Sequence, residues 1–157
     1  NYGKGELGRI REGVRKSLQM TLAVSVALTA FVYLLGQWFM TLFIAPQESW
    51  ILASGLRYIR TTSLFFGILG VNYVVRFALI GVGKTIIPMA VGLSEIATRA
   101  AVTFLLVRQF GFTGMIFASP ACWFTSTALC LACYPSMMKK AFVQRKILPQ
   151  PSANLDG

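Results

Sequence analysis

Two long stretches of this chain carry no charged residue, and they restrict its possible folds more than any other feature. They cover residues 17–47 and 109–138, so each exceeds the ~20 apolar residues that cross a ~30 Å hydrocarbon layer as a helix. Pairs of Lys or Arg flank their outer ends, at residues 15–16 and 139–140. A helix that covers the core of a soluble protein keeps a charged face toward water, and these stretches have none. The pattern predicts an integral membrane protein.

The composition supports this interpretation and excludes other classes. Hydrophobic residues make up 55% of the 157 and charged residues 13%, with no His and five acidic residues. The net charge of +10 does not indicate a nucleic-acid partner. The basic residues cluster at the ends of apolar segments and form no stripe interleaved with exposed aromatic residues. The partner we expect from composition is the lipid bilayer.

We predict an all-α fold, a polytopic membrane helix bundle of four spans. Pro46, the glycines at 81–83, and Gly111 with Gly114 mark the turns between the spans, and Pro120 is expected to bend the fourth. The chain begins without Met in a polar, glycine-rich run, so we expect it to be the C-terminal part of a larger protein. The expected parts are a loop at 1–16, spans at about 17–43, 51–80, 86–108 and 115–138, and a tail at 139–157 that is basic and then disordered.

Four spans place both ends of the chain on one side of the membrane. Ten Lys and Arg residues would lie on that side and three on the other. The positive-inside rule therefore predicts a multi-pass protein of the cell (inner or plasma) membrane with both ends in the cytoplasm. The ten are Lys4, Arg9, Arg11, Arg15, Lys16, Lys84, Lys139, Lys140, Arg145 and Lys146, and the three are Arg57, Arg60 and Arg108.

The first span carries polar residues at every fourth position. Such a stripe drifts slowly around a helix of 3.6 residues per turn, so it can meet more than one partner helix. Small and hydroxyl-bearing side chains let helices approach closely and hydrogen-bond to one another. We expect a bundle with neighbouring helices. The stripe consists of Ser17, Thr21, Ser25, Thr29, Tyr33 and Gln37.

Glu95 and Arg99 are the most informative polar pair. They share one helix face and, at ~1.5 Å per residue from Thr85, lie ~15 Å and ~21 Å deep. An unpaired charge there costs at least ~2.5–3.5 kcal/mol, so both side chains must face protein or water. Two interpretations stay open: a structural intrahelical ion pair, or coupling to an ion or a substrate.

Asn72 and Arg76 are also four residues apart, on the second span. Arg76 is near enough to Gly81 to snorkel to the interface, whereas the carboxamide of Asn72 lies deeper and needs a hydrogen-bond partner. Both are candidates for the wall of a cavity.

The sequence contains no complete motif for an enzyme, a metal site or a nucleotide site. The GxGxxG at residues 3–8 precedes a membrane span instead of following a strand, and Gly83-Lys84-Thr85 lacks the earlier glycine of a P-loop. Cys130 and Cys133 form a CxxC, but no His or second CxxC completes a zinc site. We expect packing cysteines, no catalytic residue, no metal and no cofactor.

Several short motifs occur in one order over nearly the whole chain. They are Asn1-Tyr2-Gly3-Lys4-Gly5, Leu56-Arg57-Tyr58-Ile59-Arg60, Asn72 with Arg76, the run from Gly81 to Pro88, Glu95 with Arg99, Gly111-Phe112-Thr113-Gly114, and the run from Ala118 to Trp123. Together they resemble the C-terminal third of the multidrug and toxic compound extrusion (MATE) transporters, in which Ala is usual at the position of Lys4.

The resemblance implies spans nine to twelve of a twelve-helix transporter with two lobes, this chain being part of the C-terminal lobe. Its partners would be the remaining spans of the same transporter and small organic cations. The family exports cationic or amphipathic drugs, a form of xenobiotic transport and multidrug efflux, by antiport with Na⁺ or H⁺. Some members carry a coupling carboxylate on the helix that holds Asn72 here. This chain has none there, so Glu95, held by Arg99, is our candidate coupling residue, with Asn72 and Arg76 at the cavity wall.

Two alternatives stay open from the sequence. One is a lipid-linked sugar flippase of the same superfamily, for which Arg76 and Arg99 would meet an anionic head group. The other is a stand-alone four-helix membrane scaffold or channel subunit.

Overall fold

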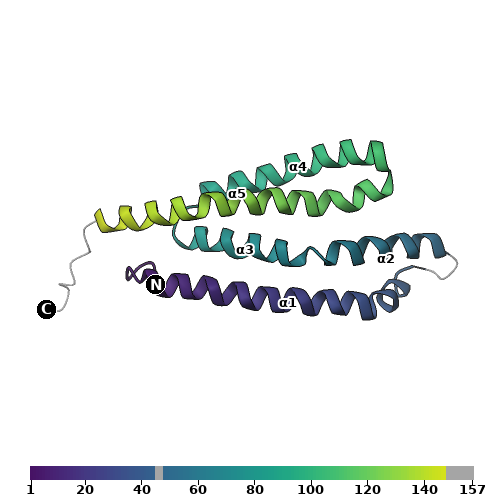
Figure 1. Ribbon diagram of the computed structural model, residues 1–157, viewed down its shortest axis with the longest axis horizontal. Helices are drawn as coiled ribbons and strands as arrows, with labels where there is room; N and C mark the ends of the chain where they lie inside the picture. The colour runs from purple at the N-terminus through teal and green to yellow at the C-terminus, as the bar shows by residue number, and fades with distance from the viewer. Residues whose placement is uncertain (45–47, 148–157) are drawn as a thin grey trace.

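The computed structural model describes residues 1–44 and 48–147, and it confirms the all-α prediction. Five helices occur in these ranges (Figure 1). They are α1 (Leu7–Thr41), α2 (Ser49–Ser63), α3 (Phe66–Gly81), α4 (Ile86–Phe110) and α5 (Phe112–Ile147).

The helices lie lengthwise beside one another, with α2 and α3 between the two flanks of the bundle (Figure 1). One flank is α1, which packs against α2 and α3, and the other is the pair α4 and α5. The start of α1, the end of α3, the start of α4 and the end of α5 lie at one end of the bundle. We call this the N-terminal end.

Length and composition make this a multi-pass membrane protein. Among the described residues α1, α4 and α5 are each long and apolar enough to cross a membrane, and α2 with α3 forms a fourth span if the bent pair is counted as one. Large apolar side chains such as Leu34 and Phe43 are more than four-fifths exposed, at 81% and 84%. Such exposure suits lipid or a further helix as neighbour.

Two helices extend beyond the spans expected from sequence. α1 begins at Leu7 instead of residue 17, and an ion pair of 2.7 Å between Glu12 and Lys16 joins adjacent turns of this added part. α5 continues through Lys139 and Lys140 to Ile147, so the first part of the expected tail is helical. Charged residues mark the edge of the hydrocarbon layer, and a helix can continue past that edge. The disorder expected for the last part of the tail, from Pro149 onward, lies outside the described residues.

The turn between α4 and α5 is a single residue. Gly111 has a φ of 55°, a left-handed conformation that glycine adopts without steric cost. Gly114, expected in the same turn, lies in the first turn of α5, where a Cβ would collide with the backbone of Leu106. This absence of a side chain lets α5 pack closely against α4.

The second expected span is broken. α2 ends at Ser63, α3 begins at Phe66, and the two axes differ by 49°. The last carbonyl groups of a helix need partners at membrane depth. The Thr29 hydroxyl of α1 lies 2.8 Å from the carbonyl oxygen of Ser63, the last residue of α2. On the other side of the break, the Thr127 hydroxyl of α5 donates to the carbonyl oxygen of Ile68, in the first turn of α3, at 3.3 Å. Neighbouring helices therefore stabilise the break.

The polar stripe of α1 meets a partner over its central part. Ser25 is buried, and the methyl group of Thr21 occupies the space left open by Gly70 of α3. Ser17, Tyr33 and Gln37, toward the ends of the stripe, are exposed. The central stripe thus packs on α3.

Candidate functional site

A buried polar network joins α3, α4 and α5, with Asn72 at its centre. The Asn72 side chain has 0% exposure. Its amide nitrogen donates to Glu95 Oε1 at 2.8 Å and to Ser126 Oγ at 2.9 Å, and the Ser126 hydroxyl donates to the carbonyl oxygen of Trp123 at 3.2 Å. The carboxamide therefore receives the partners that its depth requires.

Arg76 neutralises the carboxylate of this network. Its Nη1 lies 3.1 Å from Glu95 Oε2, and the two side chains are only 20% and 22% exposed. Nη2 donates to the carbonyl oxygen of Pro88 at 3.2 Å. A Cβ at Gly92 would lie 3.3 Å from Nη2, so glycine provides room for the guanidinium. Its carbon atom also lies 5.9 Å from the ring centroid of Tyr73, in cation–π range.

The structure replaces the expected Glu95–Arg99 pair with this contact between helices. Among the described residues no ion pair joins Glu95 to Arg99, and Nη2 of Arg99 lies 3.6 Å from Sγ of Cys122. Side chains four residues apart share a face, but a fixed donor on another helix can attract one of them away. Asn72 and Arg76 provide such donors to Glu95. Arg76, for which snorkelling was the simpler expectation, is directed at Glu95 instead of the membrane surface.

One acceptor in the network has no protein partner. Asn72 Oδ1 is buried and accepts no hydrogen bond from the described residues. The amide nitrogen of the same side chain, by contrast, donates two hydrogen bonds, to Glu95 and to Ser126. A buried carbonyl-type oxygen without a partner costs about 1–3 kcal/mol. Asn72 Oδ1 can accept a hydrogen bond from a bound donor, or it can coordinate a hard cation, which prefers oxygen ligands. The carboxylate of Glu95 supplies the second oxygen.

The network reaches the surface of α4 at a hollow of about 680 Å³. Glu95 and Arg99 contribute its charged groups, so a solute in the hollow would contact both the carboxylate and the guanidinium. The lining residues are Gly92, Glu95, Ile96, Arg99, Ala100, Thr103 and Phe104.

The sequence analysis named Asn72, Arg76, Glu95 and Arg99 as candidates, but it did not name Ser126, which the structure places in the network. Cys122, Ser126 and Cys130 lie at every fourth position of α5, and all three have 0% exposure. Small polarisable or polar side chains at this spacing signal a helix face that packs closely on neighbours. The cysteines are free thiols, and the described residues contain no group of three metal-ligating side chains.

The fold and the site define a multi-pass helical membrane protein with a buried, charge-neutralised polar network at the junction of three helices. A family model, MatE, matches residues 1–105, and the chain belongs to this family. MatE proteins are transporters and not enzymes. The match includes four of the site residues and ends before α5, which contributes Cys122 and Ser126. No curated protein and no solved structure matches the chain.

Proposed function

We propose that this chain is part of the C-terminal lobe of an ion-coupled antiporter, as spans nine to twelve, and that the transporter exports cationic or amphipathic drugs by alternating access. Membership of the MatE family supports transport. The observation that carries the coupling role is the Glu95 carboxylate, held between Asn72 and Arg76 and open to a hollow on α4.

The coupling step is a competition for Glu95. With Arg76 in place the carboxylate is neutralised, as the structure describes. A proton on Glu95, or Na⁺ bound between its Oε1 and Asn72 Oδ1, would replace this pairing and weaken the link from α3 to α4. An ion that binds one arrangement better than the other shifts the population between them by its differential affinity. Export follows when the two arrangements open the cavity to opposite sides.

The test is dye efflux from cells that make the intact transporter. An ethidium-like cation is the probe, with and without a Na⁺ gradient and a proton gradient. We expect Glu95→Gln to abolish gradient-driven efflux while leaving membrane insertion intact, because the amide cannot exchange a proton or carry the charge that binds Na⁺.

Glu12→Gln is the matched control, since Glu12 pairs with Lys16 at an exposed position on α1. It should export like the wild type. Equal efflux by Glu95→Gln and the wild type would reduce the network to a packing role.

A lipid-linked sugar flippase is the second candidate. Two guanidinium groups, Arg76 and Arg99, accompany the single carboxylate of Glu95, so the site has a net positive charge that suits an anionic head group. Absence of efflux for every cation tested, together with transport of an anionic lipid-linked sugar, would favour this function.

A further inference from the structure

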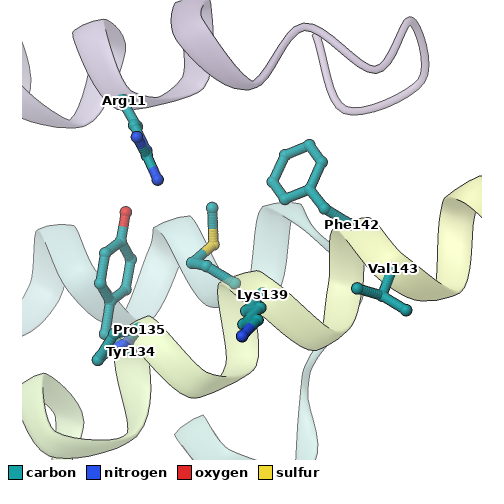
Figure 2. A pocket seen from close by; sticks show the side chains of 7 residues that line it. Arg11, Tyr134, Pro135, Lys139, Phe142 and Val143 are labelled. Carbon is teal, nitrogen blue, oxygen red and sulfur yellow. The ribbon is translucent and has the colours of Figure 1, made fainter.

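A second hollow, of about 520 Å³, lies between α1 and α5 at the N-terminal end of the bundle. Arg11 of α1 projects toward the side chains of α5 that form the other wall, and in this view its guanidinium points toward the hydroxyl of Tyr134 (Figure 2). No residue of the Asn72 network lines it. The lining residues are Arg11, Tyr134, Pro135, Met138, Lys139, Phe142 and Val143.

Its height in the bundle corresponds to the edge of the membrane. Val82, which follows the last residue of α3, packs with Met138 and Ala141, and Ile10 packs against the same cluster. Arg11 and Lys139 adjoin members of this cluster in sequence, so both cations lie level with the turn between α3 and α4. The candidate span of α5 ends a turn further along, at Val143. Lys and Arg at this level meet lipid head groups.

The hollow combines two cations with an apolar floor. The ion pairs among the described residues leave Arg11 and Lys139 without a carboxylate partner, and the neighbouring acid, Glu12, is paired with Lys16. Five of the seven lining residues are aromatic, aliphatic, proline or methionine side chains. A free phosphate ion would use only the cations, and an organic cation would be repelled by them. A molecule with an anionic head and an apolar tail matches both parts.

We propose that this hollow binds one anionic phospholipid, with its phosphate on Arg11 and Lys139 and the start of an acyl chain on Tyr134 and Phe142. The lipid would tie the start of α1 to α5. Protein contacts at this place come from Ile10 of α1, which packs against the cluster with Met138 and Ala141, and from Tyr2, which precedes α1. Tyr2 donates to the carbonyl oxygen of Ala141 at 3.1 Å and packs edge-on against Phe142 at 5.7 Å between ring centroids.

The test is native mass spectrometry of the full chain, purified in detergent and supplied with phosphatidylglycerol or phosphatidylcholine of identical acyl chains. We expect the wild type to retain one phosphatidylglycerol in preference to phosphatidylcholine. Removing both charges, in R11Q/K139Q, should weaken phosphatidylglycerol retention by about tenfold or more, since each basic residue near a lipid surface contributes measurably to binding. Val143→Trp keeps both charges and should lower retention as well, by filling the apolar floor.

The control is R15Q/K140Q, which removes the same charge from exposed positions of the same two helices outside the hollow. It should bind within about twofold of the wild type, because diffuse attraction contributes little to a single seated lipid. Equal loss in this control would show attraction to the surface charge in general and would overturn the proposal. Equal retention of phosphatidylcholine, or full retention by Val143→Trp, would overturn it too.

Discussion

At the scale of residues, the behaviour of Glu95 depends on which donors are fixed around it. Sequence spacing offered Arg99, one turn away on the same helix, whereas the structure offers Asn72 and Arg76 from α3. The amide nitrogen of Asn72 also donates to Ser126, and this second hydrogen bond helps to fix the orientation of the amide toward the carboxylate. Donors oriented in this way are stronger partners than a flexible neighbour on the same helix.

Replacing Asn72 should therefore destabilise the bundle. Asn72→Leu leaves Glu95 Oε1 and Ser126 Oγ without this donor, and we expect a loss of about 1–3 kcal/mol in the free energy of unfolding. Thermal unfolding in detergent measures it. Thr125→Val, which removes an exposed hydroxyl bonded within its own helix, is the control and should cost little. A stable Asn72→Leu variant would mean that the network contributes no packing energy.

The side-chain pairs between helices in this site could not be predicted from the sequence, for a physical reason. Periodicity relates residues of one helix, and it placed Glu95 beside Arg99 and Asn72 beside Arg76 correctly as neighbours along their helices. Which helix faces meet depends on turns and close contacts between elements. The meeting of Glu95 with Arg76 follows from the turn at Gly83, with a φ of 76°, and from the room at Gly92.

At the scale of elements, the long charge-free stretches predicted the membrane helices, because the hydrocarbon layer requires them. The break between Ser63 and Phe66 had no such signal, since neither proline nor a glycine pair lies there. Its partners are the hydroxyl groups of Thr29 and Thr127, on two other helices. A feature stabilised by tertiary contacts cannot be found from local sequence alone.

Close packing of α1 on α3 gives a prediction for Gly70. Its added Cβ would collide with Cγ2 of Thr21, so Gly70→Ala should destabilise the chain by about 1–3 kcal/mol. Thr21→Ser removes that methyl group, and the double variant should recover most of the loss. Thermal unfolding in detergent reports both. Gly81→Ala is the control, because no heavy atom lies within 4 Å of its added Cβ. Lack of recovery in the double variant would place the strain elsewhere.

At the scale of the whole molecule, an even number of spans places both ends on one side. With the bent pair counted as one span, the candidate spans among the described residues number four, and the start of α1 and the end of α5 lie at the same end of the bundle (Figure 1). From the excess of basic residues at this end we predict that both ends lie in the cytoplasm.

Single cysteines test this topology. In a background that lacks the three native cysteines, Lys4→Cys and Lys140→Cys should react with a membrane-impermeant thiol reagent only after the cells are opened, whereas Trp50→Cys at the start of α2 should react in intact cells. Labelling of position 4 and position 50 from the same side would contradict a span between them.

In the proposed mechanism Glu95 exchanges an ion when the substrate binds. The most direct measurement is ion release from the purified intact transporter on addition of ethidium, recorded as protons with a pH-sensitive dye and as Na⁺ with a radioactive tracer. We expect the wild type and Glu12→Gln to release one ion species and Glu95→Gln to release none. Equal release by Glu95→Gln would contradict this mechanism.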